Sequence, residues 1–165
     1  MKIRTLDDIA ALEARGFNSV YLHQSPWDIL RHQADIRPDA TAIRYIHDAA
    51  DGTSDEIVTY AELAGKIMGA ARLFRARGVT ARKSVAIIAQ HTVSAQVALW
   101  GAQIAGRACP INPMLKADHI AALIRAADAA AVVVMGKNSV LDYWTPLVPA
   151  LRAEGIDLPI FACDA

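Results

Sequence analysis

The stretch SVAIIAQHTVSAQVALWGAQIAGRACPINP, residues 84–113, decides the fold of this chain. It opens with a continuous apolar run, which is typical of a strand buried on both faces of a parallel sheet. Thr92 then stands where a helix N-cap is expected, and apolar residues follow at helical spacing as far as Gly106. A short strand is predicted at 107–111, and Asn112-Pro113 ends it. The stretch therefore predicts a strand–helix–strand unit.

Three further expectations follow from this strand–helix–strand unit. We expect Gly106 to take the left-handed conformation at the end of the helix. We expect the strand at 107–111 to be short because it is central and buried in the sheet. Its carboxyl end, at Asn112-Pro113, lies where ligands usually bind in open parallel sheets.

The same alternation of helices and strands continues on both sides of this unit. Upstream, Thr59 and Glu62 form a candidate capping box for a helix that Gly78 ends. Downstream, the pattern predicts a helix at 117–127, a strand at 130–134, a helix at 139–154 that Pro146 and Pro149 break, and a strand at 158–163. Such alternation favours an α/β fold, with a mostly parallel sheet flanked by helices on both faces, as in Rossmann-like and flavodoxin-like units.

The N-terminal third follows a different pattern. We expect a short helix at 6–15, a helix at 25–36 that Ser25 caps, and an antiparallel β-hairpin formed by strands at 41–46 and 56–60. A polar turn with an Asp-Gly signal joins the two strands. We interpret residues 1–165 as a single α/β domain with an N-terminal extension at 1–24.

Composition limits the function classes. Hydrophobic residues make up 54% of the 165 residues, so the chain can bury a core, and the formal net charge of zero gives no support to a nucleic-acid or anionic-membrane partner. The N-terminus lacks the apolar core of a signal peptide, and no apolar run approaches the roughly 18 residues of a membrane span. We therefore expect a cytoplasmic protein, with Cys109 and Cys163 as buried, reduced thiols.

Several kinds of chemical site lack their sequence signals. No G-x-G-x-x-G and no G-x-S-x-G motif is present. The segment at 136–138 faintly resembles a phosphate loop, but a plain strand-to-helix turn is the favoured interpretation. The five histidines are isolated from one another and from cysteine, so we expect no metal site. His91, at the carboxyl end of a predicted strand, is a possible ligand contact, although a surface or capping-loop histidine is the favoured interpretation.

Two motifs carry a resemblance to a known family. The first is TYAEL at 59–63, and the second is QIAGRACPINP at 103–113; the opening SPWDILRHQADIRPDATAIRY at 25–45 fits as well. In this order and at this spacing, they resemble the amino-terminal region of the adenylate-forming, AMP-binding superfamily. The Asn112-Pro113 ending is similar to that of the acyl-CoA synthetase branch.

The resemblance implies an enzyme that activates a carboxylic acid with ATP and Mg²⁺ and passes the acyl group to CoA. The family's phosphate loop ending in Pro-Lys, its ribose-positioning acidic motif and its catalytic lysine lie outside these residues, so the resemblance places no catalytic residue and no bound cofactor in this chain. It makes Asn112, Pro113 and Met114 candidates for a contact on the CoA side, and Lys137 the one possible counterpart of phosphate-binding arginines.

Three interpretations follow. The first is the N-terminal scaffold of an acyl-CoA synthetase, inactive alone, whose partner is the remainder of the synthetase chain. The second is a self-standing, non-catalytic binding or interaction module descended from that family, in which an exposed edge strand favours self-association. The third, an unrelated flavodoxin-like binder, is disfavoured because no phosphate loop is present. The sequence does not name the carboxylic acid.

Overall fold

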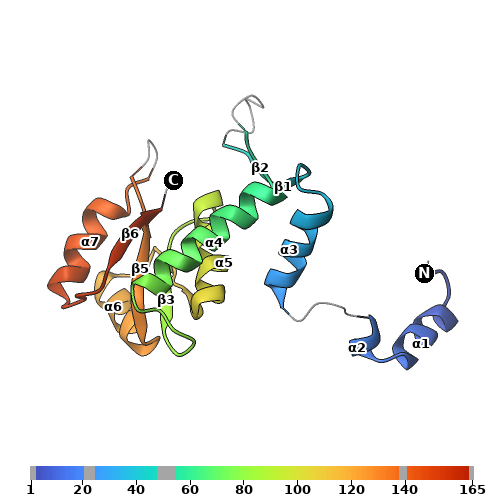
Figure 1. Ribbon diagram of the computed structural model, residues 1–165. Coiled ribbons are helices and arrows are strands. Elements are labelled where there is room, and N and C mark those ends of the chain that lie inside the picture. Colours follow the sequence, from blue (N-terminus) through green and yellow to red (C-terminus); the bar gives the residue numbers. More distant parts are fainter. Residues whose placement is uncertain (1–2, 21–24, 48–54, 138–140, 164–165) are drawn as a thin grey trace.

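The second half of the chain forms a four-stranded parallel sheet (Figure 1). The computed structural model describes residues 3–20, 25–47, 55–137 and 141–163. The strands are β3 (Ser84–Ile88), β4 (Arg107–Pro110), β5 (Ala129–Met135) and β6 (Ile160–Cys163), and they lie in the order β4-β3-β5-β6. All three neighbouring pairs are parallel, as the alternation of elements predicts.

Helices cover both faces of this sheet. On one face lie α4 (Tyr60–Ala76) and α5 (Val93–Ala105), and on the other lie α6 (Ala117–Ala126) and α7 (Trp144–Ala153). Ile87 and Val133 pack toward the first pair of helices, whereas the adjacent Ile88 and Val134 pack toward the second pair. Apart from Ser84 at the start of β3, the central strands are therefore continuously apolar, because both of their faces are buried.

The N-terminal elements form a smaller unit around an antiparallel hairpin. This unit comprises α3 (Pro26–Ile36), β1 (Thr41–Tyr45) and β2 (Glu56–Thr59), and the short helices α1 (Leu6–Ala14) and α2 (Phe17–Val20) precede it in the chain. The hairpin pairs as predicted, and Val58 joins Leu63 and Ile67 of α4 in a third apolar cluster. The short helix α2 was not predicted, and most of the predicted polar turn, at 48–54, lies outside the described residues.

The starts of α3, α4 and α5 agree with the sequence because capping is a local interaction. The Thr59 hydroxyl accepts the Glu62 N–H at 3.3 Å, and the Glu62 carboxylate accepts the Thr59 N–H at 2.9 Å. This second bond holds the pKa of Glu62 below its usual value. Ser25 and Thr92 accept backbone N–H groups in the same way at the starts of α3 and α5.

We predicted that position 106 needs glycine for a left-handed helix end, and that reason is wrong. The residue is extended, with φ −172°, and is not left-handed. A Cβ atom at this position would lie 2.2 Å from the Thr80 carbonyl oxygen and 2.6 Å from that of Lys83. Glycine is needed here because two backbone segments approach each other closely.

Strand β4 is also misplaced by the sequence argument, since it lies at the edge of the four-stranded sheet and is not central. The edge position suits Pro110, which has no N–H to donate: Ile111 makes the next bond to β3, at 2.8 Å from Ile87 O, so the nitrogen of Pro110 faces outward. Cys109 is only half-buried, against prediction, whereas Cys163 is buried; neither thiol forms a disulfide.

Helix α7 is continuous from Trp144 to Ala153, although we expected the two prolines to break it. Pro146 lies in the first turn, where a helix has no partner for backbone N–H groups. Pro149 is inside the helix and removes one internal bond without ending it. The expected start at 139 lies within 138–140, outside the described part of the chain, and the helix begins later than predicted, at Trp144.

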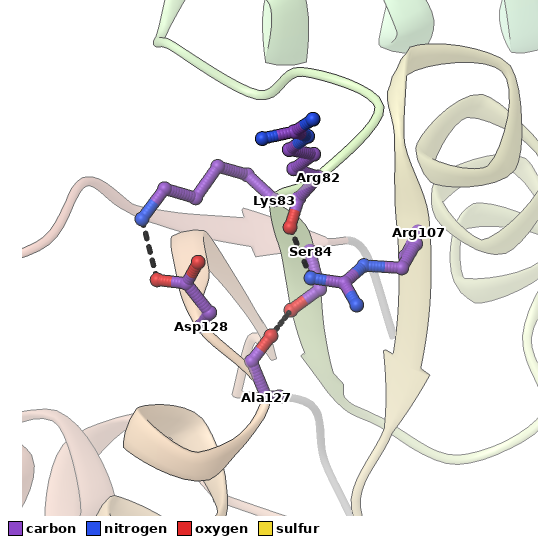
Figure 2. Close-up of polar contacts among 6 residues, drawn as sticks. All are labelled: Arg82, Lys83, Ser84, Arg107, Ala127 and Asp128. Atoms are coloured by element: carbon purple, nitrogen blue, oxygen red, sulfur yellow. Dashed lines mark hydrogen bonds and ion pairs between the residues drawn. The ribbon is translucent and has the colours of Figure 1, made fainter.

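Polar contacts fix the amino ends of the strands to one another (Figure 2). The buried Ser84 hydroxyl donates to the Ala127 carbonyl at 2.7 Å, and Lys83 forms an ion pair with Asp128. The Arg107 guanidinium donates to the Arg82 carbonyl. These contacts join the starts of β3, β4 and β5, so the amino ends of these strands are occupied by structural interactions.

Candidate functional site

The carboxyl ends of the strands, opposite the amino ends that these contacts join, carry the candidate site. In the parallel register, Ile87 of β3 lies beside Pro110 of β4, and Ile88 lies beside Val134 of β5. The three strands therefore end close together, and the residues that follow them share one edge. This is where open parallel sheets bind ligands.

A three-residue contact joins the segments at this edge. The Gln90 side-chain amide, after β3, donates to the Tyr143 hydroxyl at 3.1 Å. That hydroxyl in turn contacts the Met114 sulfur, after β4, at 3.9 Å. Neither Gln90 nor Tyr143 was singled out from the sequence. We call this arrangement the Gln90–Tyr143–Met114 cluster.

The predicted residues Asn112, Pro113 and Met114 form a turn directly after β4. The Asn112 side-chain oxygen accepts the Met114 N–H at 2.9 Å, and the Asn112 carbonyl accepts the Leu115 N–H at 3.3 Å. These bonds are typical of the turns that Asn favours, so part of the role of Asn112 is structural. Met114 remains 78% exposed at the edge of the sheet. Their contact with CoA stays a prediction.

His91 and Thr92 have separate roles in the connection between β3 and α5. His91 is exposed, whereas Thr92 is buried and its hydroxyl accepts the Ala95 N–H at 3.2 Å as the N-cap of α5. The burial of Thr92 at a helix start accounts for a hydroxyl residue at this position.

The segment that faintly resembles a phosphate loop has another use. The Gly136 N–H donates to the Cys163 carbonyl at 2.8 Å and so continues the pairing of β5 with β6. The Lys137 ammonium lies 3.6 Å from the Asp142 carboxylate and is exposed. The Thr145 N–H donates to that carboxylate and keeps the pKa of Asp142 below its ordinary value. These contacts favour the plain turn, and Asn138 lies outside the described residues.

A cavity of about 400 Å³ lies near the end of β6. Apolar side chains of α4, α5 and β6 line it, among them Phe74, Val97 and Phe161, and polar side chains from the hairpin and α4, including Glu56 and Lys66, line it as well. Its volume is within the range of small-ligand pockets. Sequence periodicity could not reveal it, because six separate elements form its walls.

The described residues contain no cluster of three or more His, Cys, Asp or Glu side chains able to bind a metal ion. Among them, too, no helix has both the length and the apolar character needed to cross a lipid bilayer.

Comparison with solved structures places the fold among adenylate-forming ligases. A fatty acyl-adenylate ligase from L. pneumophila, solved with acyl adenylate and pyrophosphate, matches 86% of this chain and 23% of its own, with a TM-score of 0.66 and 17% identity. The anthranilate CoA ligase AuaEII, solved with anthranoyl-AMP, matches 86% of this chain and 25% of its own, with a TM-score of 0.69 and 18% identity.

Sequence comparison agrees with the fold. The marinolic acid–CoA ligase of Pseudoalteromonas sp. (strain SANK 73390) is 27% identical over 140 residues, which are 83% of this chain and 21% of that ligase. This chain therefore spans about a fifth of the length of that relative. The family model described as AMP-binding enzyme matches residues 30–157, most of the chain. The chain belongs to the AMP-binding enzyme family.

Proposed function

We propose that this chain is the N-terminal scaffold of an ATP-dependent acyl-CoA synthetase and is inactive alone. The match to the AMP-binding enzyme family over residues 30–157 carries the proposal, and the acyl-CoA ligase among its relatives supports it. In the whole protein, a carboxylate attacks the α-phosphate of Mg-ATP to give an acyl-adenylate and pyrophosphate. The CoA thiolate then displaces AMP, which leaves the acyl-CoA thioester.

The residues of this chain do not fit ATP and Mg²⁺. The sequence has no glycine-rich phosphate loop, and the Gly136 N–H, the nearest candidate, is used within the sheet. We therefore assign no chemical step to this chain. Its proposed contribution is a rigid sheet whose carboxyl edge, at Asn112, Pro113 and Met114, faces the CoA side of the whole enzyme.

We further propose that residues 1–165 form one domain with an extension at 1–24, in a cytoplasmic protein. The partner of this domain is the remainder of the synthetase chain. The alternative is a self-standing, non-catalytic interaction module. One observation favours that alternative: in the described part of the chain, β6 has a strand neighbour on one side only. Such an edge favours self-association.

ATP–pyrophosphate exchange, measured with a panel of carboxylic acids, tests the proposal. We expect no exchange with the purified 165-residue chain, and exchange with the longer synthetase chain that contains it. The longer chain serves as the positive control for acid choice and assay conditions. Exchange by the 165-residue chain alone would overturn the claim that the adenylation site lies elsewhere.

A further inference from the structure

Tyr143 is held firmly by its own surroundings before it contacts the loops at the carboxyl edge. Its ring is half-buried and packs against the apolar clusters on both faces of the sheet. Its carbonyl accepts the Leu147 N–H at 3.1 Å, in the first turn of α7. The preceding Asp142 accepts the Thr145 N–H at 2.9 Å. The phenol is therefore presented from a fixed point.

The hydroxyl of Tyr143 joins two loops that are far apart in sequence. It accepts a hydrogen bond from Gln90, 53 residues away, and it donates toward the sulfur of Met114, 29 residues away. Gln90 follows β3, and Met114 follows β4. One hydroxyl thus links the connections after two adjacent strands to the start of α7.

Met114 needs such a link because its side chain is exposed. The bonds within the turn, from Met114 and Leu115 back to Asn112, set its local shape. Before the turn, the Ile111 N–H donates to the Ile87 carbonyl at 2.8 Å and ties the start of the turn to the end of β3. The Tyr143 hydroxyl adds a second contact at the exposed Met114 side chain, as supporting residues do in precise binding sites.

We propose that Tyr143 is a positioning residue that fixes the turn at 112–116 against the loop carrying Gln90. The functional consequence rests on the proposed function: if this turn meets CoA in the whole synthetase, Tyr143 acts on CoA binding through the turn. A sulfur atom is a weak acceptor, so the expected effects are modest and local.

Amide hydrogen exchange on the 165-residue chain tests the positioning role without any enzyme assay. In Tyr143→Phe, which removes only the hydroxyl, we expect the Met114 and Leu115 amides to exchange about two- to ten-fold faster. Unchanged exchange of the β5 amides in the same sample shows that the fold is intact. Tyr60→Phe is the matched control, because Tyr60 lies at the start of α4 near Arg37, and it should leave the turn unaffected.

A second variant tests whether the two partners act together. Met114→Leu keeps an apolar side chain of similar size and removes the sulfur acceptor. We expect it to speed exchange of the Leu115 amide by a similar factor, and the double variant to exchange no faster than either single variant. Unchanged exchange at Met114 and Leu115 in Tyr143→Phe, or additive effects in the double variant, would overturn the positioning role.

The longer synthetase chain separates this inference from the proposed function. There, Tyr143→Phe should raise the KM for CoA several-fold and leave the KM for ATP unchanged. Faster exchange in the 165-residue chain with an unchanged KM for CoA would uphold the positioning role and refute the CoA-side contact. A raised KM for ATP and CoA alike would contradict a role confined to this turn.

Discussion

Gly106 lies directly against the backbone of Lys83: a Cβ atom on Gly106 would stand 2.6 Å from the Lys83 carbonyl oxygen. The same oxygen accepts the Arg107 N–H at 3.0 Å. The end of α5 and the start of β4 are thus fixed to the start of β3 by backbone contacts that leave no space for a side chain.

Gly106→Ala should therefore lower the free energy of unfolding by about 1–3 kcal/mol, because the atoms in contact are backbone and cannot rotate away. Urea unfolding followed by far-UV circular dichroism measures the change. Gly65→Ala is the control: it lies in α4 with no heavy atom near its would-be Cβ, and it should raise the stability by about 0.5–1 kcal/mol. Wild-type stability of Gly106→Ala would refute the account.

The packing of α4 on α5 makes a second prediction. A Cβ atom on Gly101 would lie 2.6 Å from the Ala70 Cβ atom. Gly101→Ala should cost about 1–3 kcal/mol, and Ala70→Gly in the same chain should restore part of that loss. A double-mutant cycle from urea unfolding gives the coupling, and strictly additive effects would show that the two helices separate to accommodate the methyl group.

The contacts at the amino edge should differ in their response to salt. Ser84→Ala removes a buried hydrogen bond and should cost about 0.5–1.5 kcal/mol at low and at high salt alike. Lys83→Met removes an exposed ion pair and should cost less than about 1 kcal/mol, a loss that fades as salt increases. Thermal unfolding at two salt concentrations distinguishes them. A salt-dependent Ser84→Ala effect would contradict the structure.

Glu62 makes stability depend on pH. Its pKa is lowered in the folded state by the Thr59 N–H, so its contribution is full above the unfolded value of 4.5 and is lost as the pH falls through the folded pKa. Glu62→Gln keeps an acceptor for the capping box but does not titrate. Between neutral pH and pH about 3, the wild type should therefore lose more stability than the variant in urea unfolding. Parallel pH profiles would exclude this contribution.

Features that depend on neighbouring residues could be predicted from the sequence. The capping box of Thr59 and Glu62 follows from residue types three positions apart, and the alternation of strands and helices follows from apolar periodicity. The prediction of a parallel sheet with helices on both faces is confirmed for the same reason. These signals are local, so no knowledge of the assembled fold was needed.

Features that depend on strand order could not be predicted in this way. The chain passes from β4 back across β3 to β5, which leaves β4 at the edge, and nothing within 107–111 encodes that return. The reason for Gly106 lies in a turn more than twenty residues upstream. The Gln90–Tyr143–Met114 cluster likewise joins residues 53 and 29 positions apart, so it becomes visible only in the folded chain.

The size of the native gene product in its source cells tests the central claim most directly. An immunoblot with an antibody raised against this chain should reveal a band several times larger than these 165 residues, because the chain is proposed to be the N-terminal scaffold of a longer synthetase. A band at the size of 165 residues alone would contradict that claim and make the self-standing interaction module the leading interpretation.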